Sequence, residues 1–445
     1  MYLFTSVFLL NIFVLMYQQF EKHIHLFNNK TIFLAVSGGV DSMVLSHLLS
    51  HFSIKHTLLH CNFQLRGQDS DLDEIFIKNY AKSNQLKVNT TKFKTKEYAS
   101  QHKLTIQEAA RNLRYNWFKT FLTQKKSILL TAHHLDDSIE TFFINILRGT
   151  GLKGLTGIPN HENHIIRPLL DFNKKQIIDF AETQNIEFRE DSSNDSDNYL
   201  RNKLRHHIIP EIKNLTQNLD AKMLTLFDDL KQTNQWIEQS IKEIKIALET
   251  NYQIDIIRLN DYPVFLWYKI FSKFGLNRKQ NSELIKLING KTGSIFKTKN
   301  YNILKNRTEI IVQKKNTNTE ININIESENE VLVLNNQKFI VNQLKNEIKP
   351  DFTNNIAYLD FDKVSFPLQI RNWRKGDKIN PFGMKGSKLI SDVFVDKKIN
   401  QFQKSNQLVI LSKNQIIWMV DTVISNAFSI DPDTKFVLKI EHIKY

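Results

Sequence analysis

Two spacings of apolar residues alternate along roughly the first 185 residues of the chain. Short apolar runs, typical of buried strands, occur at residues 31–36, 56–63, 87–94 and 127–132. Between these runs, apolar residues recur every three or four positions at 70–85 and 105–122, as they do in amphipathic helices. This alternation predicts a doubly wound α/β domain with a parallel sheet, in which a ligand binds at the C-terminal ends of the strands.

The pattern changes twice further along the chain. Residues 215–275 have mainly helical spacing, and short strand-like runs follow at 293–314. The remaining C-terminal residues read mostly as strands. We therefore expect an α/β domain, a mainly helical middle domain and a small, mostly-β C-terminal domain. The expected bounds are 20–215, 216–349 and 350–445, after an apolar extension at 1–19.

The apolar extension contains no charged residue among its 19 positions. A signal sequence or membrane anchor is one interpretation, but the segment lacks a basic start and a small-residue cleavage site. It is also short for a membrane span. The interpretation we favour is that translation begins at Met16. We accordingly expect a cytoplasmic protein without stable membrane association.

The chain is strongly basic, with 60 Lys and Arg against 46 Asp and Glu and a net charge of +14. Such a surplus favours a polyanionic partner such as nucleic acid. A proteome-wide bias toward lysine and asparagine is the alternative. Cys61 is the single cysteine, which excludes a disulfide framework and a cysteine-ligated metal cluster within one chain.

The first candidate site follows the strand at 31–36. Gly38 and Gly39 permit a sharp turn and a close approach of backbone to ligand. A helical pattern begins immediately afterwards, and a helix N-terminus attracts anions. No Walker lysine is present, and a plain strand-to-helix turn is the alternative. The residues of this predicted phosphate loop are Ser37, Gly38, Gly39, Val40, Asp41 and Ser42.

The second candidate site follows the strand at 127–132. We expect a helix that begins at His133, so that His133, Asp137 and Glu140 share one helix face at spacings of four and three. Such a group can hold a metal, bind a cationic substrate or act as a base. The alternative is an acidic first turn that only complements the helix dipole.

Two basic segments complete the candidate chemistry. Glu108, Arg111 and Arg114 recur every three residues on one helix, where the arginines could contact phosphate or form ion pairs on a solvated face. The block at 371–398 carries eight Lys or Arg against three Asp, a local net charge of +5, with Trp373 among the cations. This composition suits phosphate contact with base stacking, and a solvated lysine-rich loop is the alternative.

The loop at 37–42 resembles that of the ATP pyrophosphatases, and the chain as a whole resembles the bacterial tRNA(Ile)-lysidine synthetases. The block at 371–398 is the specific part, because GMP and NAD synthetases and tRNA thiolases share SGGVDS. Ser138 stands where Gln is frequent, and Asn400 where Pro is frequent. The matching segments are SGGVDS (37–42), HCNFQLRG (60–67), EAARNLRY (108–115), HHLDDSIET (133–141), RGTGLKGL (148–155), RPLL (167–170), the stretch 190–205 and the block 371–398.

The resemblance implies a two-step reaction on an isoleucine tRNA with a CAU anticodon. ATP adenylates carbon 2 of the wobble cytidine and releases pyrophosphate. The ε-amine of L-lysine then displaces AMP to form lysidine, which changes codon and aminoacylation identity from Met to Ile. The PP-loop at 37–42 would bind the pyrophosphate, with Asp41 near a Mg²⁺ ion.

The resemblance also implies roles for other residues. Asp137 and Glu140 would bind the lysine ammonium and accept its proton, with His133 in reserve. Arg111 and Arg114 would face the ATP phosphates or the tRNA. The sequence leaves open a homodimer, the division of labour between the carboxylates and the rejection of methionine tRNAs. The implied tRNA contacts are Arg114, Arg201, Arg205, Arg371, Trp373, Arg374, Lys385 and Lys388.

Three other functions fit part of the sequence. A small-molecule amidating enzyme of the same superfamily often carries a glutaminase, for which this chain has no spare cysteine. A tRNA thiolase would need cysteines that the chain lacks. A membrane-tethered RNA-binding protein would account for the apolar start and the charge, but not for SGGVDS together with HHLDDSIET.

Overall fold

The computed structural model describes residues 14–123, 126–190, 200–315, 320–334, 336–346, 353–384 and 386–445. The chain forms two compact units, which meet in sequence between Glu238 and Gln239. Within the described residues, no helix combines the length and apolar character needed to cross a bilayer.

The first unit contains a six-stranded sheet in the order β3-β2-β1-β4-β6-β5. Its strands pair in parallel, except that the edge strand β5 runs antiparallel to β6. The four strands expected from the apolar runs and the α/β fold class are confirmed. The strands are β1 (Thr31–Ala35), β2 (His56–Asn62), β3 (Lys87–Lys92), β4 (Ser127–Leu130), β5 (His161–Glu162) and β6 (Ile165–Ile166).

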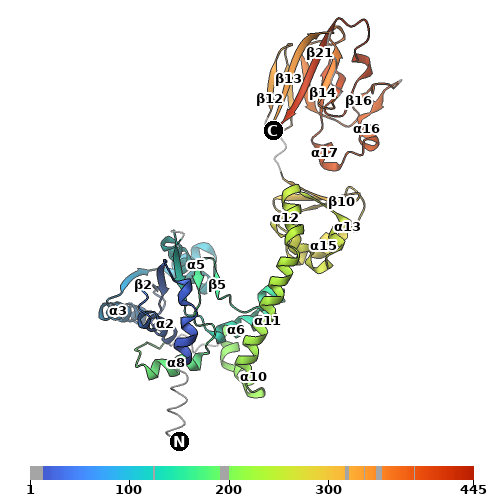
Figure 1. Cartoon of the computed structure of the whole chain (residues 1–445). Coiled ribbons are helices and arrows are strands. Elements are labelled where there is room, and N and C mark those ends of the chain that lie inside the picture. The colour runs from blue at the N-terminus through green and yellow to red at the C-terminus, as the bar shows by residue number, and fades with distance from the viewer. Residues whose placement is uncertain are drawn as a thin grey trace. The chain divides into compact units, whose positions relative to one another are not determined.

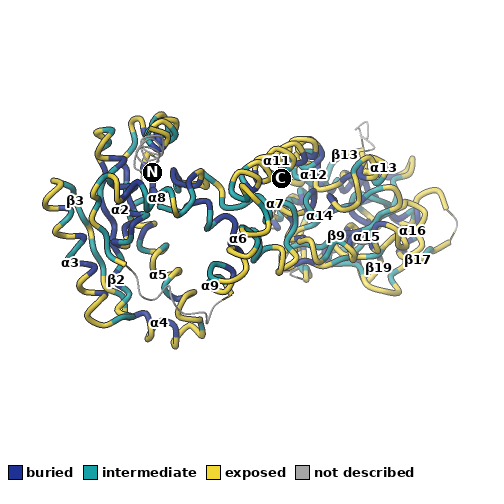
Figure 2. The backbone as a smooth tube through the Cα atoms, turned by 90° about the horizontal axis from the view of Figure 1, so that it is seen from below, coloured by how far each residue is buried: buried dark blue, intermediate teal, exposed yellow. Residues whose placement is uncertain are grey.

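Helices cover both faces of this sheet (Figure 1). Because successive strand residues point to opposite faces, Ile32 and Leu34 pack into one apolar cluster and Phe33 packs into another. The first cluster is closed by α2 (Val40–His51), α3 (Gln68–Ser83) and α8 (Lys174–Thr183). The second is closed by α5 (Ile106–Phe121). In Figure 2, α2 is buried along most of its length.

Residues 14–21 form a helix that belongs to this core. Met16 and Phe20 are fully buried in the first cluster, and the Phe20 ring stacks on Phe52 with 5.7 Å between centroids. Part of the segment that the sequence suggested as an extension therefore packs against the sheet. Residues 1–13 lie outside the described part of the chain.

The strand order places a topological switch point between β1 and β4. From β1 the chain builds outward to β2 and β3 on one side, and β4 pairs on the other side. In open parallel sheets, ligands bind in the crevice that opens at such a point, beyond the C-terminal strand ends. The segments that leave β1 and β4 there are residues 36–42 and 131–134.

A satellite cluster attaches the last helices of the unit beside this crevice. Leu135 and Ile139 of α6 (Leu135–Leu147) pack with residues of η3 (Leu204–Ile208), α10 (Ile209–Leu215) and α11 (Leu219–Ser240). This packing brings the basic segment 200–208 alongside α6. Other helices of the unit are α4 (Thr95–His102), α7 (Leu152–Leu155) and α9 (Leu200–Lys203).

The second unit begins with helices followed by a small antiparallel sheet in the order β7-β10-β9-β8. The helical spacing and the short strands expected at 293–314 are confirmed. The helices are α12 (Lys242–Asn251), α13 (Ile256–Asn260), α14 (Trp267–Ile270) and α15 (Asn281–Ile288), and the strands are β7 (Gln253–Asp255), β8 (Ile295–Lys297), β9 (Tyr301–Asn306) and β10 (Glu309–Lys314).

The C-terminal part is a sandwich of two antiparallel sheets, in the orders β11-β15-β18-β19-β20 and β12-β13-β21-β14. Apolar residues of both sheets share one core, and α16 (Ile390–Asp396) covers the outer face of the first sheet. The mostly-β expectation is confirmed. The strands are β11 (Asn322–Ile325), β12 (Val331–Leu334), β13 (Gln337–Lys345), β14 (Ile356–Asp360), β15 (Leu368–Asn372), β18 (Leu408–Ser412), β19 (Gln415–Met419), β20 (Val423–Ile424) and β21 (Phe436–Lys444).

Residues 322–345, assigned from the sequence to the middle domain, supply β11, β12 and β13 to these two sheets. Outward-facing Asn, Lys and Glu residues interrupt the apolar pattern of these strands, so the sequence alone does not assign them to the sandwich. The pairing with β15 and β21 is what joins them to the sandwich.

Candidate active site

The loop after β1 is shaped to receive an anion. Gly38 has φ +93°, a conformation that favours glycine, and Gly39 is the N-cap of α2. The Ser42 hydroxyl donates to the Gly39 carbonyl (2.9 Å) and accepts from the Ser37 N–H (3.3 Å), which closes the loop on itself. Within the described part of the chain, the N–H groups of Val40 and Asp41 have no acceptor. Two unpartnered amides at the start of a 12-residue helix fit a phosphate group.

The helix after β4 begins later than the spacing suggested. His134 is extended (φ −123°, ψ −179°) and is the N-cap, so α6 starts at Leu135. The cause is the Asp137 carboxylate, which accepts the His134 N–H (3.0 Å) and fixes the helix start. The expectation that His133 shares a helix face with Asp137 and Glu140 is therefore wrong.

His133 lies instead in the crossing from β4 to α6. Its Nδ1 is 2.9 Å from the Thr131 hydroxyl. Burial lowers the pKa of His133 to about 4, so its imidazole is neutral near pH 7. A neutral imidazole at a strand end can accept a proton.

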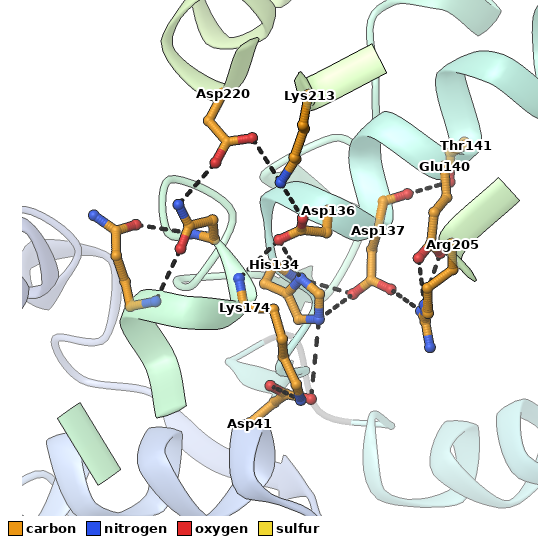
Figure 3. A network of polar contacts seen from close by, with 12 residues as sticks. Asp41, His134, Asp136, Asp137, Glu140, Thr141, Lys174, Arg205, Lys213 and Asp220 are labelled. Atoms are coloured by element: carbon orange, nitrogen blue, oxygen red, sulfur yellow. Dashed lines mark hydrogen bonds and ion pairs between the residues drawn. The ribbon is translucent and has the colours of Figure 1, made fainter. Parts of the chain in front are cut away.

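Asp137 and Glu140 both lie on α6, and Arg201 and Arg205 bond to them. Figure 3 shows Arg205 beside the two acids. Arg201 contacts Glu140 through Nε (2.5 Å) and Asp137 through Nη2 (2.8 Å). Arg205 reaches the other Glu140 oxygen (2.5 Å). The Glu140 side chain is only 1% exposed, whereas those of Arg201 and Arg205 are 41% and 36% exposed. The arginines thus neutralise a buried acid pair and still face solvent.

His134 is the centre of a second set of charges, as Figure 3 shows. Its imidazole lies 3.6 Å from Asp136, 3.6 Å from Asp137 and 4.0 Å from Asp41. Burial alone would lower the pKa of His134, but these three carboxylates outweigh it and raise that pKa. Asp137 is affected in the opposite sense: burial opposes its charge, yet His134 and Arg201 keep its pKa below the ordinary value.

Two lysines that sequence reasoning missed complete this set. Lys174 bonds Asp41 through Nζ (2.7 Å) and donates its backbone N–H to Asp136 (2.7 Å). Lys213 bonds Asp136 at 2.9 Å. Burial favours protonation of Asp136, but His134 and Lys213 hold its pKa below the ordinary value. Lys174 and Asp41 are 133 positions apart, so no local spacing could have revealed the pair.

Asp41 is a suitable ligand for a phosphate-bound metal ion. Magnesium is commonly held by one or two carboxylates together with substrate phosphates. Asp41 offers one carboxylate beside the two unpartnered loop amides, and its side chain is 26% exposed. No group of three or more His, Cys, Asp or Glu suited to a metal occurs among the residues that the structure describes. The residues present therefore fit a magnesium ion that arrives with a nucleotide.

Arg111 and Arg114 remain on the exposed side of α5. Arg111 lies over the Tyr115 ring (4.9 Å) and Arg114 over the Phe63 ring (5.1 Å). Glu108, the acid that could have paired with them, caps its own helix through Thr105 (3.0 Å). In the described ranges neither arginine forms an ion pair with a carboxylate, which leaves both guanidinium groups for an anion.

The basic block of the C-terminal part divides into internal and exposed residues. Arg371 is buried and bonds Asp377 through both terminal nitrogens (2.7 and 2.8 Å). The Trp373 indole donates to the Lys404 carbonyl (2.6 Å) and packs edge-on against Phe394. Lys388 pairs with Asp396. The Arg374 side chain is 59% exposed. Lys385 lies outside the described residues.

A parallel sheet with a Ser-Gly-Gly loop at the switch point defines a PP-loop nucleotide-binding enzyme. The family model described as a PP-loop domain matches residues 13–212. Models for the TilS substrate binding domain and the TilS substrate C-terminal domain match residues 248–315 and 368–441.

Curated relatives cover nearly the whole chain. A tRNA(Ile)-lysidine synthase of Parabacteroides distasonis is 32% identical over 95% of this chain and 98% of its own length. One from Bacteroides thetaiotaomicron is 31% identical over 94% and 96%. A crystal structure of a TILS C-terminal domain aligns at 18% identity with 28% of this chain and 98% of its own, with a TM-score of 0.26. The chain belongs to the tRNA(Ile)-lysidine synthase family.

Proposed function

We propose that the chain ligates L-lysine to carbon 2 of the wobble cytidine in a CAU-anticodon isoleucine tRNA, at the expense of ATP. The cytidine is first adenylated, with loss of pyrophosphate, and lysine then displaces AMP. The observation that carries this proposal is the meeting of an anion-binding loop and a buried acid pair at one switch point. The curated relatives and the three family models support it.

In the first step, the loop at 37–42 binds the departing pyrophosphate. The Val40 and Asp41 amides and the α2 dipole stabilise negative charge as it develops on the leaving group. Magnesium, held by Asp41 and phosphate oxygens, would offset the remaining phosphate charge. Arg111 and Arg114, which lie on α5, are further candidates to contact phosphate.

In the second step, the lysine amine must lose a proton, because its ordinary pKa is about 10.4. Asp137 and Glu140 bind the ammonium group, and neutral His133 or a carboxylate accepts the proton. Glu140 already accepts bonds from Arg201 and Arg205 on both oxygens. A third cation can bind favourably only when an arginine withdraws.

Binding of the tRNA can cause an arginine to withdraw from Glu140. Arg201 and Arg205 are partly exposed, and phosphates of a bound tRNA would attract them. We therefore assign both arginines two successive partners: the acids before tRNA binds, and tRNA phosphate afterwards. This order predicts that lysine binds tightly only after tRNA. Arg374 and Lys388 are proposed as further tRNA contacts, with Arg371 and Trp373 supporting them from inside the domain.

The test is pyrophosphate release from ATP by the full chain. We expect release that depends on the CAU-anticodon tRNA, and nucleoside analysis that finds lysidine only when lysine is added. Equal release without tRNA, or a product formed with ammonia in place of lysine, would reject the proposal and favour a small-molecule amidating enzyme. Fractionation of cells should find the protein in the cytoplasm, and light scattering decides between monomer and homodimer.

A further inference from the structure

The hairpin formed by β16 (Lys378–Ile379) and β17 (Lys388–Leu389) carries two exposed apolar side chains at its tip. Phe382 is 67% exposed and Met384 is 48% exposed. Single exposed apolar residues are ordinary on protein surfaces. Two on one short connection, inside a segment with a net charge of +5, call for a ligand that offers both an apolar face and negative charge.

The tip is held in place by the sandwich beneath it. Phe382 donates its N–H to the Ile424 carbonyl (3.0 Å), and within the connection itself Met384 donates its N–H to the Pro381 carbonyl (3.0 Å). Gly383 has φ +81° and donates to the Asn426 side chain (3.3 Å). At the base of the hairpin, Ile379 is buried against α16. These bonds fix the backbone that carries the exposed Phe382 ring. Binding a ligand there should therefore cost little conformational entropy.

Exposed cations precede this apolar tip in the sequence. Lys378 precedes the connection and is exposed, as are Arg374 and Lys375. In the portion of the chain that the structure describes, no carboxylate pairs with Lys375 or Lys378. The block has a net charge of +5 and the chain one of +14, which opposes contact with a second copy and favours a polyanion.

Trp373, the aromatic residue that the sequence offered for base stacking, is already engaged. Its indole nitrogen and its ring edge contact Lys404 and Phe394 of the same domain. Phe382 is nine positions further on, and its ring is mostly free of protein neighbours. An aromatic ring among cations is the arrangement that unpaired bases use in RNA complexes.

We propose that Phe382, with Met384 beside it, stacks on an unpaired base of the RNA substrate while the neighbouring cations contact its phosphates. This inference rests on the proposed function for the identity of the RNA. The stack is an uncharged contact. The salt dependence of its contribution to affinity therefore differs from that of every contact that Lys or Arg makes to phosphate.

The experiment measures the affinity of the full chain for the CAU-anticodon tRNA transcript across a range of salt concentrations. Phe382→Ala should weaken binding by roughly 5- to 150-fold, the range expected for one lost base stack, with no change in the salt slope. Phe382→Trp should restore binding. Phe436→Ala is the matched control, because Phe436 is 39% exposed on β21 of the same sandwich and should leave affinity unchanged.

A fluorescent base analogue makes the stack itself visible. With 2-aminopurine placed in turn in the 3′ end and in the anticodon loop, the wild-type chain should quench one position and Phe382→Ala should not. Equal affinity of wild type and Phe382→Ala, or a changed salt slope in that variant, overturns the inference. So does a Phe382-dependent dimer in sedimentation. A wild-type chain that forms no lysidine instead rejects the proposed function, and the affinity comparison can still be made.

Discussion

The acidic crevice of the first unit and the basic block of the C-terminal sandwich use charge in opposite ways. In the crevice, Asp137 and Glu140 are buried and bonded to arginines, and His134 lies among three carboxylates. In the basic block, Arg374 and Lys378 are exposed, while Arg371 is the charge turned inward. A sequence shows where charged residues cluster. Only the fold shows which of those charges are already paired within the protein and which can still contact a ligand.

The difference has an energetic basis. A buried carboxylate that loses its partner remains as an uncompensated charge, which is costly. An exposed cation is solvated with or without a partner, so its removal hardly affects folding. Substitutions of the buried acids in the crevice should therefore affect stability as well as activity, and substitutions of the exposed cations in the basic block should affect binding alone.

Glu140→Gln should have the largest effect on stability, because it replaces the buried carboxylate that accepts charge-assisted bonds from both Arg201 and Arg205 by a neutral amide. We expect a loss of about 1.5–3 kcal/mol in the free energy of unfolding, measured by denaturant titration, since Asp137 and solvent still face the two arginines. Glu97→Gln is the matched control: Glu97 pairs with Lys94 at 3.2 Å, but both side chains are well exposed, so the loss should stay below about 1 kcal/mol. Similar losses in both variants would show that burial does not set the difference.

Asp41→Ala should separate activity from stability within the crevice itself. The carboxylate is partly exposed beside Lys174, so we expect little change in melting temperature. Pyrophosphate release should fall by roughly 10²- to 10³-fold or more, as for loss of one transition-state contact. A folded variant with retained turnover would remove Asp41 from the mechanism.

Acid unfolding should test how much stability a buried carboxylate contributes in the first unit. The carboxylate in question is Glu74, which lies on α3. Burial favours protonation of this carboxyl, but bonds from Lys78 and Asn62 lower its pKa to about 2 from 4.5. A lowered pKa contributes stability that is present above pH 4.5 and is lost as pH falls toward 2, about 3 kcal/mol for this shift. Glu74→Gln should flatten that acid limb in thermal melts, and an unchanged limb would contradict the assignment.

Lys378→Ala should have the smallest effect, confined to RNA binding. Loss of one phosphate contact lowers the salt slope of tRNA affinity by about one and leaves the melting temperature unchanged. Lys363→Ala is the control in the same sandwich, because Lys363 is bonded to Asp431 at 2.8 Å. An unchanged slope for Lys378→Ala would place the RNA surface elsewhere.

The parts of the fold that could be predicted from the sequence are those with a local signal. The strands around Leu34, Leu58 and Leu129 follow from apolar runs, and Gly38 marks the sharp turn into α2. The start of α6 was predicted two residues too early, because the Asp137 side chain caps the His134 N–H and spacing alone does not reveal a cap.

The site contacts that the sequence did not predict join residues that are far apart along the chain. Lys174 and Lys213 join the crevice through α8 and α10, at distances along the chain that no motif spans. The family resemblance implies RNA contacts for Arg201 and Arg205, yet the structure brings them to Asp137 and Glu140. Trp373 was recognised from composition, and only packing shows that its ring is covered.

The helix at residues 14–21 sets a practical limit on how the protein can be shortened. Met16 and Phe20 have no exposed surface and fill the space beside α2 and α8. Truncation beyond Phe20 would remove two packed side chains and open cavities under the helix that carries Asp41, at a cost of about 2–5 kcal/mol for each large side chain removed. Purification tags are therefore better attached ahead of Met16 or after Tyr445.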